Sequence, residues 1–184
     1  MGSGVSLNGQ VPLSFQRQWQ DAQKTKPLHL SSTGVIAPAS ERGTPLIVRI
    51  LVSDAEGKPV AGAEAFGYQT DDTGIYARPG SPGPWRLKGW GITDAGGRLE
   101  LRTIRPGPYP SHVVPAHIHL TVTARCCGHQ FTDLMFDDDV LATPEFRARF
   151  AKAGEHGLYG GIRRNADGSQ EVTYTIRLRE RGEF

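Results

Sequence analysis

Glycine and proline interrupt this chain so often that long regular elements are disfavoured over much of its length. The 184 residues include 23 glycines and 13 prolines, and between residues 53 and 116 one or the other recurs every few positions. Both residues favour turns, and proline also removes a backbone donor that a helix interior needs. This punctuation predicts short strands joined by turns. A chain of this length has room for one substantial core, so we expect an all-β domain built as a β-sandwich.

Alternation of apolar and polar residues marks the expected strands. The last one, at 170–180, is the clearest, because Val172, Tyr174, Ile176 and Leu178 share one face. The remaining expected strands lie at 46–55, within 56–69, in a hairpin at 91–104, and as a pair at 114–124 and 129–136.

Helices are expected to be short and few. Residues 14–23 form one candidate, and residues 143–154, with a threonine ahead of a proline at their start, form another. Residues 70–85 are too rich in turn formers for a regular element and predict a long loop. We therefore expect an N-terminal arm and linker over 1–44 and one β-sandwich domain over 45–184.

Charge and composition argue against several classes of partner. The net charge is +2, from 21 basic and 19 acidic residues, so we expect neither nucleic acid nor a membrane surface as a partner. No run approaches the ~20 apolar residues of a membrane span. The first residues lack the pattern of a signal peptide, which favours a cytoplasmic location, although an exported protein with its signal trimmed fits equally well. Cys126 and Cys127 are neighbours that rarely bridge, and we expect them to act as small apolar residues.

Two histidines lie one residue apart in the run PAHIHLTV, residues 115–122. Alternate strand residues share a face, so His117 and His119 point one way while Ile118 and Leu120 point toward the core. Two imidazoles side by side can hold one metal ion. The alternative from the pattern alone is a pair of unrelated histidines on a solvated face.

The residues before the histidine pair narrow these alternatives. Tyr109 stands eight residues before His117, after a Pro-Gly-Pro turn, and Tyr76 stands in the long loop as part of TGIYA. The order TIRPGPYP, then PAHIHLTV, then FTDLMFDDD resembles the intradiol ring-cleavage dioxygenases over about residues 45–140. The resemblance implies an all-β, transthyretin-like β-sandwich with short helical segments and long active-site loops.

The same resemblance implies a non-haem Fe(III) site with two tyrosines and two histidines. Tyr109 and His119 match the axial pair of ligands, and His117 matches an equatorial one. Tyr76 matches the fourth ligand, with Tyr68 as the fallback. Phenolates are hard, anionic donors that favour ferric over ferrous iron, and the cation lowers the tyrosine pKa so that each binds deprotonated.

The implied reaction is the cleavage of a catechol-type ring between its two hydroxylated carbons, with O2, to a muconate-type diacid. Tyr109 is then the catalytic residue as well as a ligand, since the phenolate released on substrate binding can accept a substrate proton. Both atoms of O2 enter the product, with the metal acting as a Lewis acid. A homo-oligomer is compatible with this interpretation.

Two departures from the family pattern concern the substrate. Val114 stands where the family usually has an arginine that stabilises the bound substrate, so Arg105 or Arg125 would have to replace it. Asp133 stands where glutamine is frequent, and its carboxylate could repel an acidic substrate, accept a proton, or simply be hydrogen-bonded within its strand. Trp90 and Trp85 bracket a loop near the expected pocket, where they either stack on an aromatic substrate or anchor the core or the loop.

Two other functions fit parts of the pattern. One is a non-catalytic transthyretin-like binding module, with or without metal, which Val114 favours. The other is a zinc or Fe(II) site built from the two histidines and Asp133, or from the histidines and a cysteine. The candidate ligands favour the dioxygenase, because a binding module has no evident need for two tyrosinates.

Overall fold

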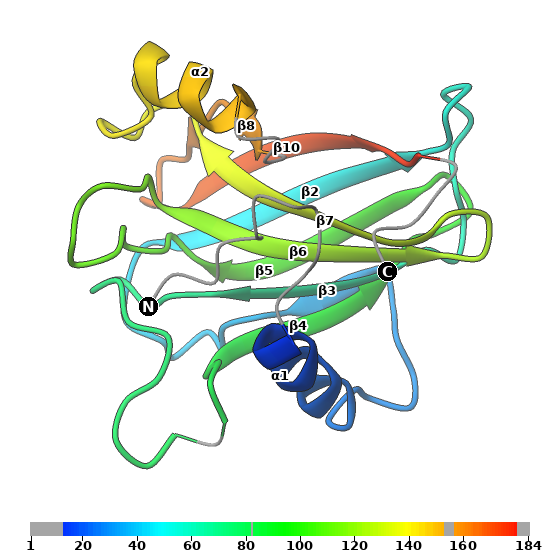
Figure 1. Ribbon diagram of the computed structural model, residues 1–184, viewed down its shortest axis with the longest axis horizontal. Coiled ribbons are helices and arrows are strands. Elements are labelled where there is room, and N and C mark those ends of the chain that lie inside the picture. The colour runs from blue at the N-terminus through cyan, green and yellow to red at the C-terminus, as the bar shows by residue number, and fades with distance from the viewer. Residues whose placement is uncertain (1–12, 82, 153–156, 180–184) are drawn as a thin grey trace.

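Two five-stranded β-sheets pack face to face in the computed structural model, which describes residues 13–81, 83–152 and 157–179 (Figure 1). The first sheet has the order β1 (Thr33–Val35), β5 (Arg98–Ile104), β2 (Pro45–Ser53), β10 (Gln170–Arg177) and β9 (Arg163–Arg164). The second has the order β4 (Leu87–Ile92), β3 (Glu64–Gln69), β6 (His117–Ala124), β7 (Gly128–Phe136) and β8 (Gly157–Gly160). The all-β fold predicted from the sequence is confirmed.

The core lies between the sheets and follows the predicted alternation. Val48 and Ile50 of β2 face Ile118 and Leu120 of β6 within one cluster, and each is at most 2 % exposed. Burying a side chain of this size contributes roughly 1.5–3 kcal/mol of hydrophobic free energy, which makes this layer the main source of stability. All four apolar residues predicted to share a face near the C-terminus are buried, with Tyr174 3 % exposed.

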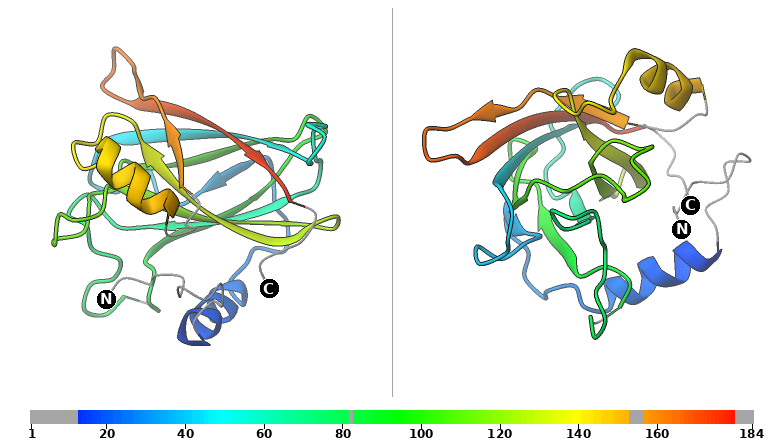
Figure 2. Two further views of the ribbon diagram at one scale, coloured as in Figure 1. Left: turned by 45° about the horizontal axis from the view of Figure 1, so that its top comes forward. Right: turned by 90° about the vertical axis from the view of Figure 1, so that its left-hand side faces the viewer.

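The short helices lie outside the sandwich, where they were predicted. Helix α1 (Leu13–Gln23) packs its Ala22 against the outer face of the second sheet, and α2 (Pro144–Lys152) lies beyond the ends of β7 and β8 (Figures 1 and 2). Thr143 caps α2, since its hydroxyl accepts a hydrogen bond from the backbone N–H of Phe146 at 3.2 Å. In the described part of the chain neither helix is long and apolar enough to cross a membrane.

The hairpin predicted at 91–104 is wrong. β4 pairs with β3 in the second sheet, whereas β5 pairs with β2 and β1 in the first, so the turn at 94–97 carries the chain between sheets. Gly97 has φ +71°, and an added Cβ would lie 2.5 Å from the carbonyl oxygen of Val52. The turn has the chemistry of a hairpin turn, and only packing against distant strands decides which partners its two arms choose.

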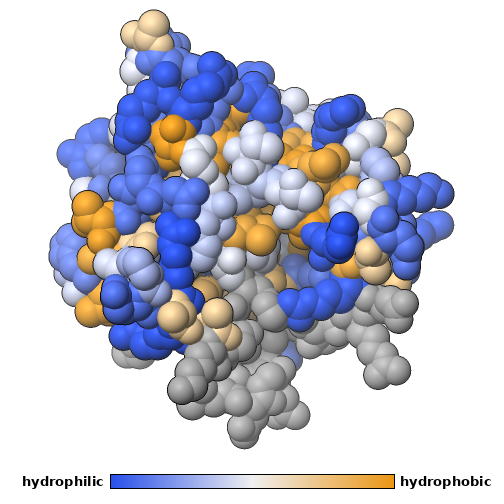
Figure 3. Space-filling model, turned by 90° about the horizontal axis from the view of Figure 1, so that it is seen from above, coloured by the Kyte–Doolittle hydropathy of each residue, from blue (hydrophilic) through white to orange (hydrophobic). Residues whose placement is uncertain are grey.

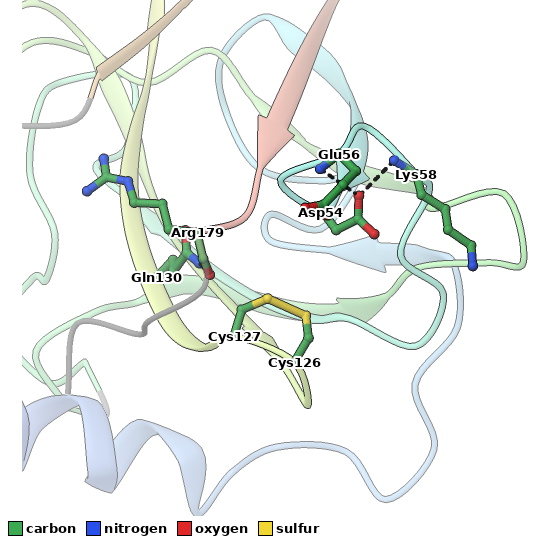
Figure 4. The surroundings of a disulfide bond; sticks show 7 residues. All are labelled: Asp54, Glu56, Lys58, Cys126, Cys127, Gln130 and Arg179. Atoms are coloured by element: carbon green, nitrogen blue, oxygen red, sulfur yellow. Dashed lines mark hydrogen bonds between the residues drawn. A yellow bond between two sulfur atoms is a disulfide. The ribbon is translucent and has the colours of Figure 1, made fainter.

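The expectation that the neighbouring cysteines stay unbonded is also wrong. Cys126 and Cys127 form a disulfide in the turn between β6 and β7 (Figure 4). The backbone N–H of Cys127 donates to Ala124 at 3.1 Å, which closes the turn, and Cys127 is buried against the core while Cys126 is exposed. A bridge between neighbours joins no distant segments, so it is not a scaffold for the fold.

The surface seen from above is mostly hydrophilic, with apolar residues in small separate patches (Figure 3). On the outer face of the first sheet, charged side chains pair across strands, as Arg49 does with Glu100 and Glu171. Such pairing of basic with acidic side chains fits a chain with nearly equal numbers of the two, 21 and 19.

Candidate metal centre

The register of the second sheet places the two histidines at its centre. β6 lies between β3 and β7, so His119 stands opposite Tyr68 on one side and Asp133 on the other, and His117 stands opposite Met135. These side chains lie on the outer face of the sheet, away from the sandwich core. The loops at 70–86 and 105–116 reach this end of β6, on the left in Figure 1.

In each of the two imidazoles, a hydrogen bond at Nδ1 fixes the orientation of the ring. Nδ1 of His117 lies 2.7 Å from the carbonyl oxygen of Pro115, and Nδ1 of His119 lies 2.6 Å from Oδ1 of Asp133. Both partners are acceptors, so each Nδ1 donates a hydrogen bond and each Nε2 is turned toward the tyrosine hydroxyls. The two Nε2 atoms are 3.1 Å apart. Burial and the neighbouring His119 lower the pKa of His117 to about 4, so this imidazole is neutral near pH 7.

Tyr109 places the first hydroxyl next to the two histidine Nε2 atoms. Its oxygen lies 3.1 Å from Nε2 of His117 and 3.3 Å from Nε2 of His119. The Pro-Gly-Pro turn before it limits the backbone conformations of this loop. Burial raises the pKa of Tyr109 to about 12, so in the metal-free protein this phenol is neutral near pH 7.

Tyr76 supplies the second hydroxyl. Its oxygen lies 2.5 Å from the hydroxyl of Tyr109 and 2.7 Å from Nε2 of His119, so the structure brings all four predicted ligands together. Tyr68, the fallback, stacks its ring on His119 with centroids 4.6 Å apart, and on Trp85 with centroids 3.9 Å apart. Burial, and then repulsion from Tyr109, raise the pKa of Tyr76.

These four atoms have the chemistry of a metal site. Two imidazole nitrogens and two phenol oxygens gather here, each within hydrogen-bond distance of at least two of the others, at the side chains of Tyr76, Tyr109, His117 and His119. The raised tyrosine pKa values belong to a site without a cation, and a bound metal ion would reverse them. The donor set fits a hard, highly charged cation such as Fe(III).

Asp133 orients the site instead of joining the four donors. Its carboxylate, His117 and His119 offer ligand atoms within 4.8 Å of one another, a spacing that a metal could bridge. However, Oδ1 of Asp133 is hydrogen-bonded to Nδ1 of His119, which lies on the far side of the ring from the tyrosines. Burial opposes ionisation of Asp133, but attraction to His119 and the hydrogen bond between them outweigh it and lower the Asp133 pKa.

The predicted substrate residues Trp90 and Arg105 have partners elsewhere. Nε1 of Trp90 donates to Gln23 of α1 at 3.3 Å, and its ring packs on Phe66. Arg105 pairs with Asp138 at 2.7 Å, and its guanidinium lies over the ring of Phe136. None of these contacts involves the four donor atoms.

Sequence reasoning did not identify the role of two residues at this site. Trp85, which was expected either to stack on a substrate or to act as an anchor, forms the aromatic layer behind Tyr68. Asp139 is the last of three consecutive aspartates, a run typical of a solvated turn, yet its Oδ2 accepts the backbone N–H of Ala116 at 2.8 Å, next to His117. No local pattern distinguishes Asp139 from its acidic neighbours, because its partner is distant in sequence.

Comparison with known proteins agrees with this geometry. A family model described as "Dioxygenase" matches residues 24–180, most of the chain. The chain belongs to the intradiol ring-cleavage dioxygenase family. Catechol 1,2-dioxygenase 1 of Acinetobacter lwoffii is 31 % identical over 136 residues, which cover 60 % of this chain and 43 % of that enzyme. The chain thus spans less than half the length of this curated relative.

Solved structures show the same fold. The dioxygenase domain of a dioxygenase carbohydrate-binding protein fusion from Streptomyces sp. SirexAA-E is 27 % identical, with a TM-score of 0.61 over 78 % of this chain and 85 % of that one. Catechol 1,2-dioxygenase from Pseudomonas arvilla C-1 is 24 % identical, with a TM-score of 0.64 over 92 % of this chain and 68 % of that one. The second likeness concerns the fold alone.

Proposed function

We propose that this protein is a non-haem Fe(III) intradiol dioxygenase. It cleaves a catechol-type ring between the two hydroxylated carbons with O2 and forms a muconate-type diacid. One observation carries the proposal: the hydroxyl of Tyr109 contacts the Nε2 atoms of both histidines, and the hydroxyl of Tyr76 contacts that of Tyr109 and Nε2 of His119. A relative named as a catechol 1,2-dioxygenase supports the substrate class.

In this proposal the four side chains hold Fe(III), which when bound supplies a Lewis-acid centre for the catechol oxygens and the reaction with O2. His117 and His119 contribute neutral Nε2 donors, whose orientation Pro115 and Asp133 maintain. Tyr76 and Tyr109 contribute phenolates, whose negative charge favours the ferric state. The stacked rings of Tyr68 and Trp85 would exclude water from the side of His119.

Tyr109 is proposed as the catalytic residue. Its hydroxyl lies 3.1 and 3.3 Å from the two Nε2 atoms, farther than the 2.7 Å between the Tyr76 hydroxyl and Nε2 of His119. Tyr109 is therefore the side chain that would give way to the substrate, and its phenolate oxygen would accept a proton from a substrate hydroxyl.

Absorption spectroscopy with a tyrosine variant tests the proposal. The protein loaded with Fe(III) is expected to show a visible tyrosinate charge-transfer band that shifts with catechol without air, and then to consume O2 and form the diacid. Tyr109→Phe should weaken the band and reduce turnover by about 100-fold or more, the range of one acid–base group.

Tyr174→Phe is the matched control, because Tyr174 is a buried tyrosine whose hydroxyl donates to the carbonyl oxygen of Met135, outside the donor set. This variant should keep the band. A protein that stays colourless with Fe(III) would contradict the proposal, and colour without turnover would favour a metal-binding module.

A further inference from the structure

The two tyrosines of the site lie on loops, so strand pairing does not set the distance between them. Tyr76 follows β3 within residues 70–86, and Tyr109 follows β5 within residues 105–116. Their hydroxyls are nevertheless 2.5 Å apart. Because each loop alone has considerable conformational freedom, other contacts must hold the two loops together.

The backbone of Asp71 bonds both loops. Its N–H donates to the carbonyl oxygen of Ile75 at 2.9 Å, which closes the turn just before Tyr76. Its carbonyl oxygen accepts the N–H of Gly74 at 3.1 Å and, from the other loop, the N–H of Gly107 at 2.8 Å. One residue therefore connects the turn that carries Tyr76 to the turn that precedes Tyr109.

The carboxylate of Asp71 completes the Tyr76 turn, and its side chain is fully buried. Oδ1 accepts the N–H of Thr73 at 2.9 Å, the hydroxyl of Thr73 at 2.6 Å and the N–H of Ile75 at 3.2 Å. Oδ2 accepts from Arg78 at 2.6 Å and, at 3.5 Å, from Arg86. Burial alone would raise the pKa of Asp71, but these hydrogen bonds outweigh it and hold the pKa well below its ordinary value.

Close backbone packing leaves no slack between the loops. Gly74 has φ +82°, and an added Cβ would lie 2.0 Å from the carbonyl oxygen of Pro108. An added Cβ at Gly107 would lie 2.6 Å from the carbonyl oxygen of Asp72. The hydroxyl of Thr70 also donates to the carbonyl oxygen of Gly107 at 2.8 Å. A small displacement of one loop must therefore move the other.

We propose that the Asp71 carboxylate is a positioning group: it fixes the turn that carries Tyr76, and the backbone bond between Asp71 and Gly107 passes that order to the loop of Tyr109, so that the tyrosine hydroxyls lie at the histidine Nε2 atoms. It acts through Tyr76 and Tyr109 and touches neither metal nor substrate. The inference depends on the proposed function only in those experiments that use bound iron as the readout.

The test compares Asp71→Asn with Asp72→Asn after loading with Fe(III). Asparagine keeps the size of Asp71 but loses the charge that pairs with Arg78, and it places a donor where one carboxylate oxygen stood. Iron should still bind, while the charge-transfer absorbance per bound iron falls to about half as one of two tyrosinates leaves its place. Asp72 is the matched control, because its carboxylate pairs with Arg42 at 3.0 Å instead of bonding the turn that carries Tyr76; Asp72→Asn should keep the parental absorbance.

A lower melting temperature of Asp71→Asn with unchanged absorbance per iron would overturn the inference, since Asp71 would then only stabilise the fold. If Asp71→Asn does not fold, Arg78→Gln decides by the same readout, because the Arg78 side chain is 53 % exposed and its loss should leave folding intact. A smaller loss of absorbance in the same direction is expected, and parental absorbance would overturn the inference.

Failure of the proposed function has a different signature, a parent protein that stays colourless with Fe(III). Crystal structures of the metal-free parent and of Asp71→Asn, or of Arg78→Gln if the former does not fold, would then decide the inference. The separation of the two tyrosine hydroxyls should increase from 2.5 Å to beyond hydrogen-bond reach. An unchanged separation would overturn the inference.

Discussion

The two histidines of the candidate site differ in the partner that each Nδ1 has. His117 donates to a neutral backbone carbonyl, whereas His119 donates to the carboxylate of Asp133. A hydrogen bond to a carboxylate is stronger than one to a neutral carbonyl, so the ring of His119 should be held more firmly than that of His117. The same carboxylate adds one negative charge behind His119, one imidazole ring away from the proposed substrate position. In the described residues, none of the contacts of the four donor atoms involves a lysine or arginine.

This charge predicts selection among catechols. Fe(III)-loaded protein should bind uncharged catechol more tightly than 3,4-dihydroxybenzoate, and Asp133→Asn should reduce that preference by about tenfold, because it removes a repulsion of roughly 1–2 kcal/mol. Dissociation constants from the catechol-induced band shift, measured without air, check this. Asp138→Asn removes a carboxylate that pairs with Arg105 away from the donors, and it should leave the preference unchanged. An equal preference in parent and Asp133→Asn would contradict the prediction.

Residue identities were predictable where their signal is local. His117, His119 and Tyr109 lie within a short segment whose spacing is distinctive, and the structure brings their donor atoms together. Asp71 joins two loops and Trp85 stacks from a loop on Tyr68 of β3, and strand pairing places none of these loops, so the positions of Asp71 and Trp85 in the sequence carry no such signal.

At the scale of elements, alternation along β6 places core residues on one face of the strand and the histidines of the candidate site on the other. Ile118 and Leu120 are at most 1 % exposed in the core, while His117 and His119 lie on the other face. The longer strands β2, β3, β6, β7 and β10 were predictable because such alternation is local, whereas the short strands β1, β8 and β9 were not expected. Sheet partners were not predictable: the arms of 91–104 separate into different sheets, since packing against β2 and β3 decides their pairing.

The turn at the far end of β6 gives a prediction for its disulfide. Cys126 and Cys127 follow the last residue of β6, whereas His117 is its first, so reduction should not reach the site. The disulfide closes the smallest possible loop. Reducing it should therefore lower the free energy of unfolding by only about 1 kcal/mol and the melting temperature by roughly 2–4 °C. Calorimetry with and without reductant checks this, with Cys126→Ser/Cys127→Ser as the reductant-independent control. A loss of the Fe(III) band on reduction would contradict it.

At the scale of the whole molecule, the site joins parts of the chain that the sandwich core does not join. The loop of Tyr76, the loop of Tyr109 and the outer face of β6 meet there. Behind them, Tyr68, Trp85 and Phe66 form a second apolar cluster under α1, so the outer face of this sheet is packed as well (Figure 2). A metal ion held by the four donors would tie these segments in the folded state only.

Iron should therefore stabilise the folded protein by mass action. Free Fe(III) at about 1,000 times its dissociation constant adds roughly 4 kcal/mol to the free energy of unfolding, provided that the unfolded chain does not bind it. For a chain of this size, that corresponds to a rise in melting temperature of about 8–16 °C. Thermal melts of the protein before and after chelation of its iron measure this difference.

The double variant Tyr76→Phe/Tyr109→Phe is the control, because it keeps both rings and both histidines but removes the two hydroxyl donors. Without phenolates the site retains two neutral imidazoles, which hold Fe(III) weakly, so iron should barely change the melting temperature of this variant. The variant should still respond to Zn²⁺ if the histidines and Asp133 form a separate site. An equal rise with Fe(III) in parent and double variant would show that the tyrosines are not ligands and would contradict the four-donor centre.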